Sequence, residues 1–188
     1  MKAIFSIISA IILSVNCISA QIPVQRFEGE LNVGFTSSLG NFHDGKHQIG
    51  ADFGLELRYN HPLTACDYGV ALNVTTAVYG FSGHSESIDW SRDQSNRGIN
   101  LMLVGDYNFR QGRKVNPFVG TGIGLSFYET VNDPVYSING TTFVWQPRVG
   151  VELFHHLRLS LFSTVSRSGL CNFGFTIGGV IGGRPKKH

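Results

Sequence analysis

Charge is scarce in this chain of 188 residues, since Asp, Glu, Lys and Arg make up only 15% of it, against roughly 25% in soluble domains. The formal net charge of +2 is too small to favour a nucleic-acid partner. Beyond the N-terminal stretch, no apolar run approaches the roughly 18 residues that a transmembrane helix needs. These shortages argue against nucleic-acid binding and a helical membrane protein. A lipid-facing surface made of strands needs few charges and fits the composition.

Cysteine is also scarce, with three in the chain. One of them lies in residues 1–20, which we predict to be a signal peptide because a positive start and a short apolar stretch lead to the small-residue cleavage pattern Ile18-Ser19-Ala20. The remaining residues, 21–188, are long enough for one domain. The other two cysteines, Cys66 and Cys171, are predicted to lie at opposite ends of that domain, too far apart for a disulfide.

Alternation of apolar and polar residues is the dominant pattern, and it is clearest in residues 142–153. One face of that segment carries Phe143, Trp145, Pro147, Val149, Val151 and Leu153. The other carries Gln146, Arg148, Gly150 and Glu152. Because side chains of a strand alternate between its two faces, this pattern predicts a sheet with one apolar and one polar side.

Eight such segments follow the signal and predict an all-β fold, an eight-stranded antiparallel up-and-down transmembrane β-barrel. The predicted strands cover residues 26–37, 47–59, 67–79, 98–109, 115–128, 142–153, 157–165 and 171–182. Longer connections alternate with shorter ones, the longest being 80–97, as in barrels with long outer loops and short periplasmic turns. An even number of strands places both termini on the periplasmic side. Aromatic residues at segment ends fit interfacial girdles.

The competing architecture is a soluble barrel of lipocalin type, which has its apolar face inside. Alternation by itself does not say which face is inside. Lipid outside is favoured because the apolar faces are bulky and nearly free of charge, while the opposite faces combine glycine with acids and bases.

Three stretches carry a family resemblance, at residues 117–124, 146–152 and 174–179. The chain resembles the small outer-membrane β-barrel proteins of Gram-negative bacteria, of the OmpA-barrel and OmpX class. The resemblance implies a monomer integral to the bacterial outer membrane. It further implies contacts with outer-membrane lipid and lipopolysaccharide, and insertion by the barrel-assembly machinery.

Nine charged residues have inward parity and are the predicted site of interest. They are Glu28, Glu30, Asp52, Glu56, Arg58, Asp106, Arg148, Glu152 and Arg158. The lumen of an eight-stranded barrel is just wide enough for side chains to fill, and charges buried there must pair or neutralise. We expect an ion-pair network that closes the lumen, with Glu152 opposite Arg158 across the turn at His155. The alternative is a narrow conduit that favours cations.

No catalytic, cofactor or metal site is predicted. Residues 166–170 faintly resemble the serine segment of barrel enzymes that deacylate lipid A, but the adjacent histidine which that chemistry needs is missing. His43, Asp44 and His47 do not amount to four convergent metal ligands. Residues 120–124 superficially match a nucleotide loop, yet a strand pattern rather than a helix follows their glycines.

The expected function is therefore non-enzymatic, either structural or in surface interaction. Residues 80–97 mix Trp, Arg, Asp and Ser and are a candidate loop for an extracellular ligand. A narrow porin-like conduit and a lipid A acyl hydrolase remain the alternatives.

Overall fold

The computed structural model describes residues 24–38, 45–47, 49–85, 88–132, 137–166 and 171–183. The predicted signal peptide at 1–20 lies outside these residues. Within them, no helix is long and apolar enough to cross a membrane.

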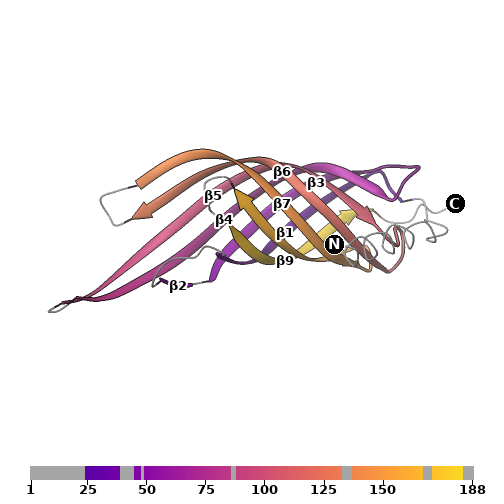
Figure 1. The fold of residues 1–188 in the computed structure, drawn as a ribbon. Helices are drawn as coiled ribbons and strands as arrows, with labels where there is room; N and C mark the ends of the chain where they lie inside the picture. Colours follow the sequence, from indigo (N-terminus) through magenta and orange to yellow (C-terminus); the bar gives the residue numbers. More distant parts are fainter. Residues whose placement is uncertain are drawn as a thin grey trace, which may run out of the picture.

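Every regular element of the described chain is a β-strand. The elements are β1 (Phe27–Ser38), β2 (Gly45–His47), β3 (Ile49–Asn60), β4 (Cys66–Ser85), β5 (Ile88–Asn108), β6 (Val115–Asn132), β7 (Ser137–Leu153), β8 (Leu157–Ser166) and β9 (Asn172–Gly182). The three residues of β2 pair only with β4, beyond the end of β3. The other eight strands form the barrel seen in Figure 1.

The barrel is closed because its first and last strands pair with each other. Val33 of β1 lies opposite Phe53 of β3 on one side and Ile177 of β9 on the other. Every other pairing among the eight barrel strands joins neighbours in the ring, and all the pairings, including that of β2 with β4, are antiparallel. The predicted all-β, eight-stranded antiparallel barrel is therefore confirmed. Glu28 pairs with Gly182, so β1 begins and β9 ends at the rim that carries the short turns.

The predicted loop at 80–97 is wrong, because residues 80–85 and 88–97 belong to strands; residues 86 and 87 lie outside the described residues. Pairing between β4 and β5 continues from Thr76 with Arg97 to Ser85 with Ile88. In Figure 1 this β4–β5 hairpin projects farthest from the barrel. The apolar alternation stops near Thr76 because only the band that faces lipid requires it, whereas backbone hydrogen bonds extend the ladder beyond that band.

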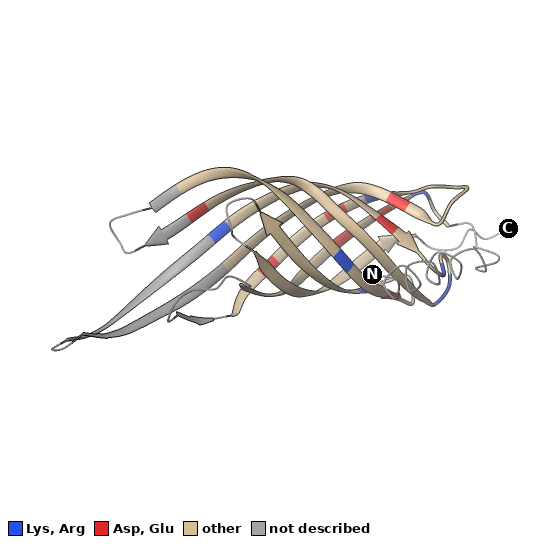
Figure 2. Cartoon of the chain, viewed as in Figure 1, with Lys and Arg blue, Asp and Glu red and all other residues tan. Residues whose placement is uncertain are grey.

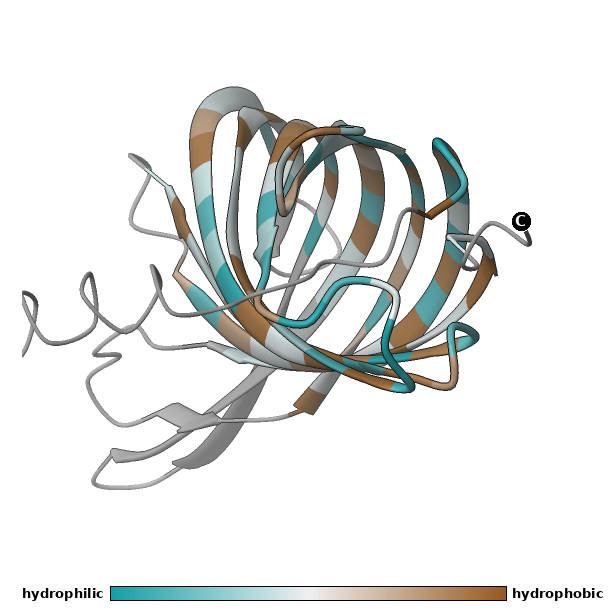
Figure 3. Ribbon diagram, turned by 90° about the vertical axis from the view of Figure 1, so that its right-hand side faces the viewer, coloured by the Kyte–Doolittle hydropathy of each residue, from teal (hydrophilic) through white to brown (hydrophobic). Residues whose placement is uncertain are grey.

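The two faces of the sheet differ in exposure, as the alternation of apolar and polar residues predicts. Residues of β3 alternate between exposed and buried positions; Leu55 is 44% exposed and its neighbour Glu56 only 2%. Figure 3, which looks along the barrel, shows strands banded by hydropathy around a closed ring. Large apolar side chains face outward and charged ones inward, which rules out the lipocalin arrangement.

Aromatic side chains gather on the outer face near the short-turn rim. The rings of Phe27 and Tyr59 lie 5.4 Å apart, and those of Tyr59 and Tyr68 lie 5.5 Å apart. These three residues are cross-strand neighbours on β1, β3 and β4. This row agrees with the interfacial girdle expected for that end of the barrel.

The turn between β7 and β8 is tight. Phe154 and His155 have φ values of 55° and 63°, and the backbone N–H of His156 donates to the Leu153 carbonyl over 3.1 Å. Two positive φ angles in succession are typical of a type I′ turn, whose twist matches that of the flanking strands. Three residues, 154–156, separate the paired Leu153 and Leu157, and this loop length places Glu152 opposite Arg158, as predicted.

Candidate functional site: the charged lumen

All nine predicted charged residues are buried inside the barrel, none more than 8% exposed. Figure 2 shows that most of the strand charges gather in the half of the barrel nearer the short turns. We call Glu28, Glu30, Glu56, Arg58, Asp106, Arg148, Glu152 and Arg158 the lumen charge cluster. Asp52 lies apart from it.

Arg58 holds the part of the cluster nearest to β1. Its Nη2 lies 3.1 Å from Glu28 Oε2 and 3.1 Å from Glu30 Oε2. Its Nε lies 3.6 Å from Glu56 Oε1 on its own strand. One arginine thus forms ion pairs with three carboxylates of β1 and β3, which lowers the cost of burying their charges.

Arg148 reaches across the lumen from β7 to β3. Its Nη1 and Nη2 donate to Glu56 Oε2 and Oε1 over 2.6 and 2.7 Å. Its Nε and Nη2 also donate to Asp106 Oδ1 and Oδ2, both over 2.8 Å. Bidentate pairing of this kind is the strongest that a guanidinium forms with carboxylates. The arrangement ties β3, β5 and β7 together through one side chain.

Arg158 completes the cluster from β8. It donates from Nη2 to Asp106 Oδ2, and its Nε lies 3.6 Å from Glu30 Oε2. The guanidinium carbon lies 3.5 Å from the ring centroid of the buried Phe118, an arrangement that favours a cation over an aromatic face. Its separation from Glu152 is longer, 3.9 Å between Nη1 and Oε2.

Asp106 lies within ion-pair distance of all three arginines: Arg148 and Arg158 donate to it, and Arg58 Nη1 lies 3.7 Å from its Oδ2. The carboxylate has room only because its cross-strand neighbour is Gly120. A Cβ at Gly120 would lie 1.7 Å from Asp106 Oδ1. The glycines at 120–124 therefore make space within the lumen, as expected, and are not part of a phosphate loop.

Asp52 lies above the cluster and contacts none of the arginines. Thr75 Oγ1 donates to its Oδ2 over 2.7 Å. Its Oδ1 is buried without a hydrogen-bond partner in the described part of the chain. Asp52 therefore lies outside the ion-pair network that the sequence led us to expect, and its carboxylate instead accepts from Thr75, its cross-strand neighbour on β4.

The sequence analysis did not predict a layer of hydrogen-bonded polar side chains at the short-turn rim. Asn108 Nδ2 donates to Asp67 Oδ2 over 2.7 Å, and Asn116 Nδ2 donates to Asn108 Oδ1 over 2.9 Å. Asn60 Nδ2 donates to Glu28 Oε1 over 2.7 Å and links this layer to the cluster. Parity would have found Asp67, because it directly precedes the outward Tyr68.

In the described residues, the other half of the lumen is lined by uncharged side chains apart from Asp52. Ala71, Met102, Val104 and Val144 form a small buried apolar cluster, and beyond it Gln146 Nε2 donates to Thr164 Oγ1 over 3.0 Å. A cavity of about 40 Å³ remains between polar residues that include Asn100 and Ser126. This volume holds one or a few water molecules, not a solute.

The described residues give little support to the other candidate sites. These contain no group of three or more His, Cys, Asp or Glu side chains placed to hold a metal ion. His43 and Asp44 lie outside them, and so do residues 167–170 of the serine segment.

Known proteins with a similar fold show which kind of barrel this is. No family model matches the chain, and no curated protein matches it. Among solved structures, Neisserial surface protein A aligns with a TM-score of 0.53 at 12% identity, covering 82% of this chain and 96% of that one. The fold is that of a small outer-membrane β-barrel protein.

Two further solved barrels are similar. The attachment invasion locus protein Ail of Yersinia pestis aligns with a TM-score of 0.49 at 12% identity, covering 83% of this chain and 99% of that one. The N-terminal β-barrel domain of OprF from Pseudomonas aeruginosa has a TM-score of 0.48 at 12% identity, covering 84% of this chain and 99% of that one.

Proposed function

We propose that this protein is an integral barrel of the bacterial outer membrane with a closed lumen and a structural or surface-interaction role, not an enzyme. It is a monomer in this proposal, with both termini in the periplasm. Outer-membrane lipid and lipopolysaccharide surround it, and the barrel-assembly machinery inserts it. The observation that carries the proposal is the pair of opposite faces, apolar and exposed outside, charged and buried inside.

The lumen charge cluster supports closure. Arg58, Arg148 and Arg158 reach their carboxylates from three different strands, β3, β7 and β8, and are at most 8% exposed. An ion moving through the lumen would have to separate bidentate pairs that lie in a low-dielectric interior. Beyond the cluster, the small apolar group around Met102 narrows the path further.

Planar-bilayer recording of the purified barrel tests this closure. We expect no unitary conductance from the wild-type protein. A double variant, Arg148→Ala with Phe118→Ala, removes the central bridge and the ring under Arg158, and we expect it to conduct weakly. The variant Thr142→Ala, near the rim opposite the short turns, is the matched control and should show no conductance. Regular channel openings from the wild-type protein would contradict a closed lumen and favour the narrow conduit.

The β4–β5 hairpin supports the surface-interaction part of the proposal. It extends beyond the apolar band as a paired ribbon of backbone. Binding of a partner to such a ribbon carries little ordering cost, because its strands are already paired.

An epitope inserted between Ser85 and Ile88 tests whether the hairpin is displayed. We expect an antibody to bind it on intact cells. The same epitope in the turn at 110–114 should be reached only after permeabilisation. An epitope at 85–88 that becomes accessible only after permeabilisation contradicts display at the surface.

A further inference from the structure

The turn between β5 and β6, residues 109–114, carries three exposed cations, Arg110, Arg113 and Lys114. It belongs to the short-turn rim, where Figure 2 shows blue on the loops of the barrel. In the part of the chain that the structure describes, none of these three side chains has a hydrogen bond or an ion pair. We call these three residues the basic turn.

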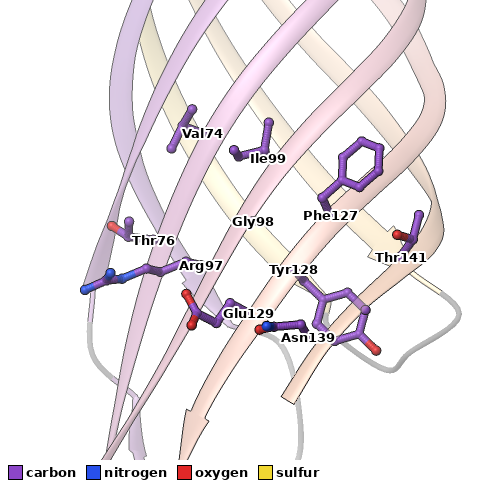
Figure 4. Close-up of a pocket in the computed structure, with 11 residues that line it drawn as sticks. Val74, Thr76, Arg97, Gly98, Ile99, Phe127, Tyr128, Glu129, Asn139 and Thr141 are labelled. Atoms are coloured by element: carbon purple, nitrogen blue, oxygen red, sulfur yellow. The ribbon is translucent and has the colours of Figure 1, made fainter. Parts of the chain in front are cut away.

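Exposed charge at this rim has one sign in the described residues. The acidic side chains at its strand ends, Glu28, Asp67 and Glu152, are buried in the lumen and at most 7% exposed. The opposite rim differs, because Arg97 there has an acidic cross-strand neighbour, Glu129, on the outer wall (Figure 4). The outer surface around the basic turn therefore attracts anions, and the described side chains beside it supply none.

The backbone of the basic turn is held by the rest of the barrel. Between its cations lies the buried Gln111, whose Nε2 donates to Asn60 Oδ1 over 3.3 Å. The backbone N–H of Phe154 donates to the Lys114 carbonyl over 2.6 Å. These bonds tie the turn to the end of β3 and to the turn between β7 and β8. A ligand that binds the cations therefore pays little to order the chain that carries them.

Apolar side chains border the basic turn. The rings of Tyr107 and Phe109 lie 5.2 Å apart in an edge-to-face arrangement, Val115 is 44% exposed and Phe154 is 63% exposed. Aromatic residues in such positions lie at the level of lipid headgroups. A partner dissolved in the periplasm has no need of these flanking apolar residues, whereas a lipid uses both them and the cations.

The cations lie at headgroup depth. Arg110 is two residues beyond the end of β5, and Lys114 directly precedes β6. At ~3.3 Å per residue and a strand tilt of about 45°, one or two residues advance about 2–5 Å along the membrane normal. The headgroup layer is about 5–7 Å thick on each side of the hydrocarbon core.

We infer that the basic turn binds the headgroups of anionic glycerophospholipids, of the phosphatidylglycerol class, in the periplasmic leaflet. This inference rests on the proposed function, whose topology places the short-turn rim in the leaflet made of glycerophospholipid. The guanidinium groups of Arg110 and Arg113 donate to phosphate oxygens in charge-assisted hydrogen bonds, and the Lys114 ammonium adds a third positive charge. Phosphatidylethanolamine is disfavoured, because its own ammonium is repelled by the same three cations.

Native mass spectrometry of the full chain tests the inference, in micelles that contain equal amounts of phosphatidylglycerol and phosphatidylethanolamine with identical acyl chains. We expect the wild-type protein to retain phosphatidylglycerol preferentially. Arg113→Gln should lower the ratio of the two retained lipids about fivefold, the equivalent of ~1 kcal/mol for one cation near an anionic surface. Arg97→Gln removes one exposed arginine at the opposite rim and is the matched control, which should leave the ratio unchanged.

A triple variant, Arg110→Gln with Arg113→Gln and Lys114→Gln, should abolish the preference. Equal retention of the two lipids by the wild-type protein overturns the inference. A preference that survives in the triple variant also overturns it, because the anionic lipid is then held elsewhere. Cosedimentation with purified peptidoglycan that depends on the three cations, without any lipid preference, would assign the basic turn to the cell wall instead.

Insertion into vesicles of the same two lipids, followed by circular dichroism, separates this result from the proposed function. Failure of the wild-type protein to insert overturns both proposals. Normal insertion without lipid selectivity overturns only the lipid site. The same measurement shows whether the variants are folded, and the single variant Arg113→Gln decides the question if the triple variant is not.

Discussion

Arg148 and Glu56, 92 residues apart in the chain, form a bidentate ion pair across the lumen, with N–O distances of 2.6 and 2.7 Å. The same guanidinium also binds Asp106, so its loss leaves two buried carboxylates short of a partner. Removing one member of a buried pair costs more than the pair contributes, because an uncompensated charge stays behind.

We therefore expect Arg148→Met to lower the free energy of unfolding by about 3–5 kcal/mol, measured by denaturant titration in micelles. Adding Glu56→Gln should recover part of this loss. The pair Glu152 and Arg158 is the matched control, because its 3.9 Å separation predicts a much smaller coupling energy. Equal coupling energies in the two double-mutant cycles would indicate a hydrated lumen, in which these distances do not matter.

Gly120→Ala should destabilise the barrel by about 1–3 kcal/mol, as overpacking does in other interiors. The new Cβ would lie 1.7 Å from Asp106 Oδ1 and would displace the carboxylate that forms ion pairs with three arginines. Gly179→Ala is the control, because nothing lies within 4 Å of a Cβ built there. Thermal unfolding in micelles compares them, and a harmless Gly120→Ala would mean that Asp106 has room to move.

Leu103→Arg tests which face meets lipid. Leu103 is 63% exposed, midway between Ile99 and Tyr107 on β5. An arginine at mid-membrane costs about 2–4 kcal/mol in such barrels, and about 0–1 kcal/mol near the interface. Ile99→Arg should therefore be tolerated much better than Leu103→Arg when both are unfolded from lipid vesicles. Two equally mild substitutions would show that the band does not face hydrocarbon.

Cys66 and Cys171 report the orientation of the barrel. Cys66 is exposed at the short-turn rim, and Cys171 directly precedes β9 at the opposite rim. We expect a membrane-impermeant maleimide to label Cys171 on intact cells, and Cys66 only after permeabilisation. The reverse order would place the short turns, and with them both ends of the barrel, on the outside.

The sequence alone determined the number of strands, their antiparallel order and the direction in which their side chains point. Parity is a local property of a strand, so Glu56, Asp106 and Arg148 could be assigned to the lumen without coordinates. The tight turn at His155 likewise fixed the register of Glu152 with Arg158, because the loop length of a hairpin fixes its pairing.

Tertiary structure alone decided which inward charges meet. Alternation places side chains in the lumen, but the closure of the ring and the stagger of its strands bring Arg148 to Glu56 and leave Asp52 with Thr75. Tertiary structure also decided where β4 and β5 end, since backbone pairing beyond the apolar band that faces lipid needs no apolar pattern. Arg97 and Glu129 became neighbours by the same means, because residues 32 positions apart meet only when β5 and β6 pair in register.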